Sequence, residues 1–222
     1  MLEASKRVLI FGASGRIGRR VAAEALRRGH AVVGVVRSSP AGRRPPEGLE
    51  VVVGDARAPA EVRRLSRGVD VVISATRPAK GREAELVEVA TSLLAGLRGA
   101  SVPLVLVGGA ARLDIPGTGG RRVLDDPRLV HDAWRDLAAA CVDQLAVCER
   151  APEVPWTYVS PPAFLEEAPP LGAYRLGTDE LVVDERGASR MAVEDFALAV
   201  VDAAEDAVAE AGGRRLSVGP GA

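Results

Sequence analysis

Three glycines, Gly12, Gly15 and Gly18, recur at every third residue in the stretch VLIFGASGRIGRRVAAEALRRGHAVVGVVR. An apolar run precedes them and a run with helical periodicity follows. In such a turn the first glycine permits a tight bend, the second lets backbone N–H groups approach a pyrophosphate, and the third lets the helix pack close to the sheet. The helix N-terminus favours the negative phosphate. The motif predicts a dinucleotide site built on Gly12, Ala13, Ser14, Gly15, Arg16, Ile17 and Gly18. A tight turn without a ligand is the alternative.

The residue that ends the next apolar run bears on the choice of cofactor. An acidic residue there would hold the ribose 2′-hydroxyl of NAD, whereas a cation suits the 2′-phosphate of NADP. Here the run ends in Arg37, and Ser38, Ser39, Arg43 and Arg44 follow closely. The sequence therefore favours NADP(H) over NAD(H), with Arg16 as a second cation for the phosphate. The alternative is a loop of solvated arginines.

Three further strand ends carry residues that fit the same ligand. Asp55, followed by Ala56, is placed to accept a hydrogen bond from the adenine amino group, although an aspartate there also suits the start of a helix. The small residues Ser74, Ala75 and Thr76 would let a ribose lie close to the next strand end. Gly108 and Gly109 follow the fifth run, where the nicotinamide is expected.

Alternating elements must position these residues. Runs rich in Val, Ile and Leu predict strands at 8–11, 31–37, 49–53, 69–74, 103–107 and 154–159, with two short strands at 174–176 and 181–183 and a last one at 214–218. Helical patterns cover 15–28, 59–66, 83–97, 127–150 and 193–209. Near-continuous apolar strands indicate a parallel sheet buried on both faces, and the βαβ alternation indicates a doubly wound α/β fold.

Length and composition limit the alternatives. The 222 residues suit a single domain over 1–222, in which the proline-rich segment 160–222 contributes a small cap on the substrate side. A net charge of −1 gives no general attraction to nucleic acid. No membrane segment, signal peptide or metal-ligand spacing is found, so a cytoplasmic protein is expected. Cys141 and Cys148 stand too far apart on a helix to form a disulfide. The sequence leaves monomer and dimer equally open.

Several segments resemble a known family. GASGRIG, VVVGDARAP, VDVVISAT, VLVGGAARL, YVSPPAF and GAYRLGTDELVVDERGASRMAVEDFALAVVD are similar to the atypical short-chain dehydrogenase/reductases. Within that group, the resemblance is to the NAD(P)H-binding branch that includes biliverdin reductase B and bacterial NADH-flavin reductases. It implies a Rossmann domain with a small C-terminal cap. The cofactor cleft implied by it also includes Pro161, Pro162, Ala163 and Phe164.

The sequence departs from the family pattern where proton transfer is expected. Standard members carry a Tyr-x-x-x-Lys pair, which the helix PRLVHDAWRDLAAACVDQLAVCER lacks. Gly108, Gly109 and Ala110 replace a usual serine or threonine. His131 and Phe164 are weak candidates for a catalytic or substrate contact, and a surface histidine is the favoured reading of His131.

The remaining aromatic and histidine residues have structural readings. Trp134 and Trp156 could stack on a flavin ring, but packing in the core or the cap is favoured for both. His30 stands at a helix end, where a structural role is favoured.

Three functions remain open from the sequence. The first is an NAD(P)H-dependent reductase of a flavin or a similar small planar acceptor, with the flavin as substrate rather than prosthetic group, and with direct hydride transfer. The second is a non-catalytic NADP(H) sensor, for which the loop 115–122 could contact a partner. The third is an epimerase or dehydratase acting on a nucleotide sugar, which the missing tyrosine weakens.

Overall fold

A central sheet of eight strands forms the body of the molecule. The computed structural model describes residues 5–37, 45–207 and 209–221. The sheet strands are β1 (Arg7–Phe11), β2 (Ala31–Val36), β3 (Glu50–Val53), β4 (Val71–Ser74), β5 (Leu104–Val107), β6 (Trp156–Ser160), β8 (Tyr174–Gly177) and β10 (Gly213–Pro220). Their order is β3-β2-β1-β4-β5-β6-β10-β8. All neighbours are parallel except β8, which is antiparallel to β10.

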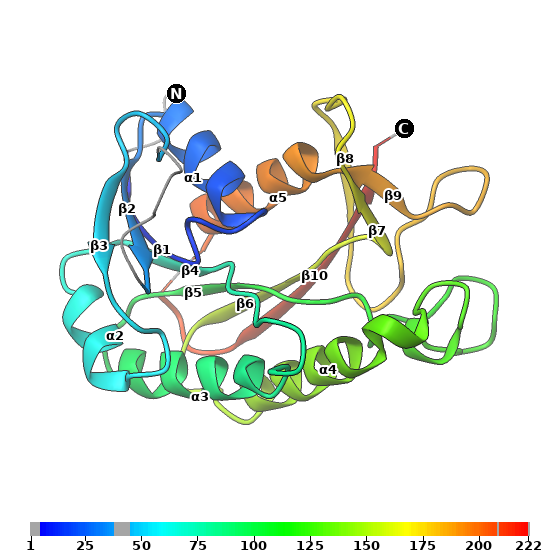
Figure 1. Cartoon of the computed structure of the whole chain (residues 1–222), viewed down its shortest axis with the longest axis horizontal. Coiled ribbons are helices and arrows are strands. Elements are labelled where there is room, and N and C mark those ends of the chain that lie inside the picture. The colour runs from blue at the N-terminus through cyan, green and yellow to red at the C-terminus, as the bar shows by residue number, and fades with distance from the viewer. Residues whose placement is uncertain (1–4, 38–44, 208, 222) are drawn as a thin grey trace.

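Five α-helices within the described residues cover the two faces of the sheet (Figure 1). They are α1 (Gly18–Arg27), α2 (Pro59–Leu65), α3 (Glu85–Leu97), α4 (Arg135–Glu149) and α5 (Val193–Glu205). Helices α1 and α5 cover one face, and α2, α3 and α4 cover the other. Along β1, Val8 and Ile10 enter the first core while Leu9 and Phe11 enter the second. This two-sided burial explains the unbroken apolar strands and confirms the predicted doubly wound, Rossmann-like fold.

A smaller part beside the sheet holds the short parallel strands β7 (Phe164–Glu166) and β9 (Arg190–Ala192). Met191 of β9 belongs to the first core, and a separate apolar cluster is centred on Leu113, Val123, Val130 and Leu181. Helix α5 and strand β10 belong to the main body, because α5 packs on α1 and β10 pairs with β6. The predicted cap over 160–222 therefore includes elements that the structure places in the sheet layers.

Several predicted boundaries were wrong for identifiable reasons. The first helix begins at Gly18 instead of residue 15, because residues 12–17 form the turn. The predicted strand at 181–183 is absent from the described chain; there, Leu181 donates its N–H to the Asp114 carbonyl at 2.8 Å. Strands β7 and β9 have three residues each and were missed.

The predicted helix over 127–150 was wrong in its first third. Two 3₁₀ turns, η1 (Val123–Asp125) and η2 (Asp132–Trp134), precede α4. The Asp126 carboxylate accepts the Arg128 N–H at 3.0 Å. A side chain that binds a nearby backbone N–H in this way competes with helix formation. His131 consequently lies at the start of a 3₁₀ turn rather than within a helix.

Candidate active site

The glycine turn joins β1 to α1 through two close backbone approaches. Gly12 has φ +82°, a left-handed conformation that favours glycine, and a Cβ there would lie 2.7 Å from the Ala75 carbonyl oxygen. A Cβ on Gly18 would lie 2.2 Å from the Gly12 carbonyl oxygen. The helix can therefore begin against the strand end only because both residues are glycine. The predicted conformational roles of Gly12 and Gly18 match this geometry.

The turn presents backbone donors at the start of α1. Gly15 donates its N–H to the Gly12 carbonyl at 2.9 Å, and Arg19 donates to the Gly15 carbonyl at 3.1 Å. The N–H groups of Ser14, Arg16 and Ile17 have no hydrogen-bond partner among the described residues. Donors of this kind at a helix N-terminus, where the helix dipole is positive, form a favourable site for an anion.

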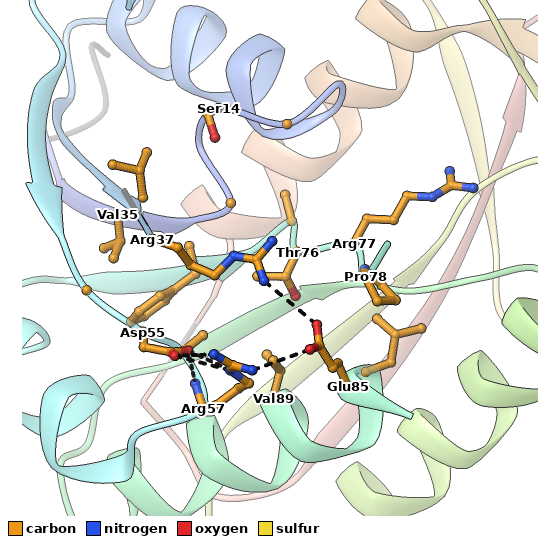
Figure 2. A pocket seen from close by; sticks show the side chains of 18 of the residues that line it. Ser14, Val35, Arg37, Asp55, Arg57, Thr76, Arg77, Pro78, Glu85 and Val89 are labelled. Carbon is orange, nitrogen blue, oxygen red and sulfur yellow. Dashed lines mark hydrogen bonds and ion pairs between the residues drawn. The ribbon is translucent and has the colours of Figure 1, made fainter. Parts of the chain in front are cut away.

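A cavity of about 260 Å³ opens between this turn, the ends of β2, β3 and β4, and the start of α3 (Figure 2). The predicted residues that line it are Gly12, Ser14, Gly15, Arg16, Arg37, Asp55, Ala56, Ala75 and Thr76. Ala13, Gly18 and Ser74 are buried outside its lining, and Ile17 packs partly buried against the core. The parallel topology thus brings four separate strand ends to one cavity, as doubly wound sheets do at their ligand sites.

Two arginines meet at one carboxylate in this cavity. Arg37 Nη1 lies 3.8 Å from Glu85 Oε2, and Arg57 Nη1 lies 3.3 Å from Glu85 Oε1 (Figure 2). Arg82 also pairs with Glu85, which is 12% exposed. Sequence reasoning missed Arg57 and Glu85, because only the fold brings the start of α3 beside the ends of β2 and β3. Ser38, Ser39, Arg43 and Arg44, which were grouped with Arg37, lie outside the described residues.

Asp55 is engaged by Arg57. Its carboxylate accepts hydrogen bonds from the Arg57 backbone N–H at 2.9 Å and from Arg57 Nη2 at 2.6 Å. The Arg57 guanidinium holds the pKa of the Asp55 carboxyl below its ordinary value. Asp55 does not cap α2, whose N-cap residue is Ala58. The proposed adenine contact would therefore involve an ionised carboxylate that Arg57 already orients.

Arg16 points toward the C-terminal part of the chain. Its Nε lies 2.8 Å from Glu167 Oε1, and its Nη2 donates to the Leu165 carbonyl at 3.0 Å. Arg20, one turn along α1, pairs with Glu167 and lies 2.5 Å from Glu194 Oε1. These ion pairs fasten the β7 segment to the glycine turn. Arg16 also lines the cavity, and its contact with a phosphate stays a prediction.

Similarity to known proteins identifies the family of this chain. A model of the family described as NAD(P)H-binding matches residues 12–204. The chain belongs to this NAD(P)H-binding family. The Bacillus subtilis protein YwnB, which is uncharacterised, is 30% identical over 199 residues, which are 88% of this chain and 91% of YwnB.

Solved structures support the same assignment. A Streptococcus pneumoniae protein described as a candidate NADH-flavin reductase is 25% identical, with a TM-score of 0.82 over 97% of this chain and 99% of that one. A candidate epimerase from Bacteroides thetaiotaomicron is 31% identical, with a TM-score of 0.83 over 97% of each chain. The donors of the turn, the guanidinium groups and the cavity are of the kinds that an NAD(P)H dinucleotide requires.

Packing at the end of β5 explains why glycine occupies position 108. A Cβ on Gly108 would lie 2.0 Å from the Tyr158 ring, and one on Gly109 would lie 2.7 Å from Cys141 Sγ. The Tyr158 hydroxyl accepts the Gly109 N–H at 3.2 Å and lies 3.0 Å from the Cys141 carbonyl oxygen. Burial raises the Tyr158 pKa well above its usual value. A serine at position 108 is sterically excluded here, and Tyr158 is poorly suited to pass a proton.

The remaining predicted residues lie outside this cavity. Gly108 and Gly109 are absent from its lining, as are His131, Phe164, Pro161, Pro162 and Ala163. His131 is exposed. Phe164 lies under the Arg190 guanidinium, which is 4.5 Å from the ring centroid. Ala163 packs against the small apolar cluster.

The two tryptophans differ in burial. Trp156 is buried, as expected. Trp134 is 53% exposed, so the packing role favoured for it was wrong.

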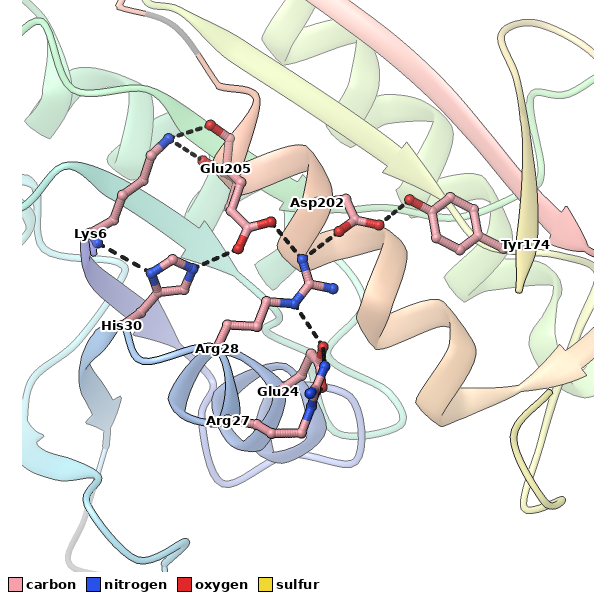
Figure 3. Close-up of polar contacts among 9 residues, drawn as sticks. Lys6, Glu24, Arg27, Arg28, His30, Tyr174, Asp202 and Glu205 are labelled. Carbon is pink, nitrogen blue, oxygen red and sulfur yellow. Dashed lines mark hydrogen bonds and ion pairs between the residues drawn. The ribbon is translucent and has the colours of Figure 1, made fainter. Parts of the chain in front are cut away.

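His30 is structural. Figure 3 shows its ring between the start of β1 and the end of α5. His30 Nε2 lies 2.8 Å from Glu205 Oε1, and Nδ1 accepts the Lys6 N–H at 3.2 Å. Arg28 joins the same network through Glu24 and Glu205. The network ties α1 to α5, and none of its residues lines the cleft.

Neither a metal cluster nor a membrane span is found in the part of the chain that the structure describes. Its His, Cys, Asp and Glu side chains form no group of three or more that could hold a metal ion. None of its helices has the length and hydrophobicity needed to cross a bilayer.

Replacing Gly18 with alanine tests the turn. The added methyl group would meet the Gly12 carbonyl, so we expect a loss of about 1–3 kcal/mol in the free energy of unfolding, as for other overpacked sites. Thermal unfolding should show a Tm lower by several degrees. The control is Gly29→Asn, because Gly29 has open space around its Cβ position and asparagine tolerates its positive φ. Equal Tm values for Gly18→Ala and the parent would contradict the close approach.

The reactivity of Cys141 tests burial beside the cleft. Burial raises the pKa of its thiol to about 11, so the thiolate is scarce at neutral pH. We expect iodoacetamide to label Cys141 slowly at pH 8 in the folded protein and faster as the pH rises toward 11. Mass spectrometry of the labelled peptide measures this. Labelling at pH 8 as fast as in urea-unfolded protein would show that the thiol is accessible and unshifted.

Proposed function

We propose that this protein is an NADPH-dependent reductase of a flavin or a similar small planar acceptor. One observation carries the proposal: among the described residues, no tyrosine or lysine side chain lines the cavity, and a glycine, Gly108, follows β5 where a serine or threonine is usual. Gly108 lies against the Tyr158 ring, and the Tyr158 hydroxyl is bonded to backbone. Reduction of a carbonyl group requires a proton donor beside the hydride acceptor, whereas a flavin can take its proton from water.

The NADPH nicotinamide would supply a hydride to flavin N5, and the resulting anion would take one proton from solvent. The protein's contribution is to hold the two rings together and to orient them. The glycine turn would bind the pyrophosphate through backbone N–H groups. Arg37 and Arg57 would bind the 2′-phosphate, and Asp55 would accept a hydrogen bond from the adenine amino group.

The same observation counts against an epimerase but not against a sensor. An epimerase that passes protons through tyrosine is disfavoured because no tyrosine lines the cavity among the described residues, although one structural relative is described as a candidate epimerase. A sensor that binds NADPH without consuming it needs no such residue. The flavin assay separates it from a reductase. We also place the protein in the cytoplasm, since its two cysteines are free and a reducing compartment keeps them so.

The test of the activity follows NADPH absorbance with catalytic amounts of protein. We expect consumption that depends on FMN or riboflavin, and none with simple ketones or aldehydes. NADPH binding without consumption in the presence of any flavin would instead support the sensor. Turnover of a ketone at a rate comparable to that of a flavin would contradict the proposed lack of a proton donor.

Removing the charge of Arg37 tests the choice of cofactor. We expect Arg37→Gln to raise the Kd for NADPH about tenfold and to leave the Kd for NADH nearly unchanged, because one charge-assisted contact to the 2′-phosphate is lost. Arg57→Gln should act in the same direction. Fluorescence titration with each nucleotide measures both values.

A matched control for these variants is Arg98→Gln. The Arg98 guanidinium pairs with Glu153 at the opposite end of α3 from Glu85. Arg98→Gln changes the net charge by the same amount as Arg37→Gln and should leave the Kd values for NADPH and NADH unaltered. If Arg37→Gln weakens NADH as much as NADPH, the 2′-phosphate contact is wrong.

A further inference from the structure

One guanidinium of the cleft differs from the rest. Arg16, Arg37 and Arg57 line the cavity, and each is paired with a carboxylate. Arg77 also lines it but has no ion pair and no side-chain hydrogen bond among the described residues. Figure 2 shows the Arg77 side chain extending away from the Arg37–Glu85 pair. A cation is therefore left without an anion on this side of the cleft.

The Arg77 guanidinium lies over an exposed aromatic ring. It is 5.0 Å from the centroid of Trp134, whose side chain is 53% exposed in spite of its size. Trp134 immediately precedes α4, and Arg77 follows β4 by three residues. The contact therefore bridges two elements that approach each other at the carboxyl end of the sheet. Stacking of this kind holds a guanidinium in place while its N–H edge stays free to donate hydrogen bonds.

This pair lies toward the end of the cleft where the acceptor is expected. The positive charge of Arg77 acts on Cys141, opposing the rise in its thiol pKa. A Cβ on Gly109 would contact Cys141. Arg77 is thus near the end of β5, on the other side of the cavity from Arg37. A 2′-phosphate on Arg37 and an acceptor beside Arg77 would occupy separate parts of the cleft.

We propose that Arg77 and Trp134 form the acceptor subsite and that it selects planar acceptors bearing an anionic group. The indole supplies a face for a flat ring. The planar guanidinium supplies paired donors for a phosphate or carboxylate. This inference rests on the proposed reductase function and adds a charge requirement to it.

FMN and riboflavin form a matched pair of probes, because they share the isoalloxazine ring and differ in the terminal phosphate. We expect kcat/KM to be about five- to tenfold higher for FMN, the size of one partly exposed charge-assisted contact. Arg77→Gln should abolish the advantage of FMN, so that kcat/KM becomes the same for the two flavins. Trp134→Ala should lower kcat/KM for both flavins by a similar factor. Trp134→Phe should keep most of the parent value, because it retains an aromatic face.

Binding provides a second readout that does not depend on turnover. Quenching of flavin fluorescence, with the protein saturated by NADP⁺, gives Kd values for FMN and riboflavin. Arg77→Gln should raise the Kd for FMN alone. The affinity for NADPH should stay constant in this variant. Arg98→Gln is the control with the same change in net charge, and it should alter none of these values.

Three results would overturn the inference. If both flavins are reduced and their ratio is the same in Arg77→Gln and the parent, the subsite is wrong while the reductase function stands. If Arg77→Gln raises the Kd for NADPH as much as the Kd for FMN, Arg77 binds the dinucleotide rather than the acceptor. If the protein binds NADPH but neither binds nor reduces a flavin, the proposed function fails and the subsite fails with it.

Discussion

The contact between Gly18 and the Gly12 carbonyl is the constraint on which the site depends. It places the start of α1 directly against the end of β1, with no room for a side chain on either residue. The N–H groups of the turn then face the edge at which β2, β3 and β4 also end. In a parallel sheet these ends lie side by side, so that one close approach determines which residues meet in the cleft.

Ion pairs between arginines and carboxylates determine how the charged side chains of the cavity are arranged. Several cations stand close together, and this would be unfavourable without intervening anions. Glu85 supplies one such anion between Arg37, Arg57 and Arg82, and Asp55 holds Arg57 from the other side. A dinucleotide phosphate entering here would find guanidinium groups already oriented, but it would share them with Glu85. Arg77, which lacks a carboxylate partner among the described residues, stands apart from this balance.

The sequence was most informative where local backbone rules apply. The spacing of the glycines predicted the turn, because a positive φ and the absence of a Cβ are requirements of single residues. The apolar runs predicted the parallel sheet, since burial on both faces leaves a direct mark on composition.

Contacts between distant segments could not be read in the same way. Glu85 reaches Arg57 across 28 residues, and nothing near either residue indicates the pairing. Tyr158 explains Gly108 only once Val107 is placed opposite Val159 in the sheet. The start of α4 was misplaced because the Asp126 carboxylate binds the Arg128 N–H and the helix begins only at Arg135, after two 3₁₀ turns. Trp134 precedes this helix and is exposed.

The central claim is that the cleft brings a reduced nicotinamide to a planar acceptor and needs no proton-passing residue. An anaerobic single-turnover experiment, with NADPH bound to excess protein and FMN then added, tests it most directly. We expect NADPH and FMN absorbance to fall together, one for one, at a shared rate that slows when the transferred hydrogen is deuterium. Tight binding of NADPH with no change in either absorbance would contradict it.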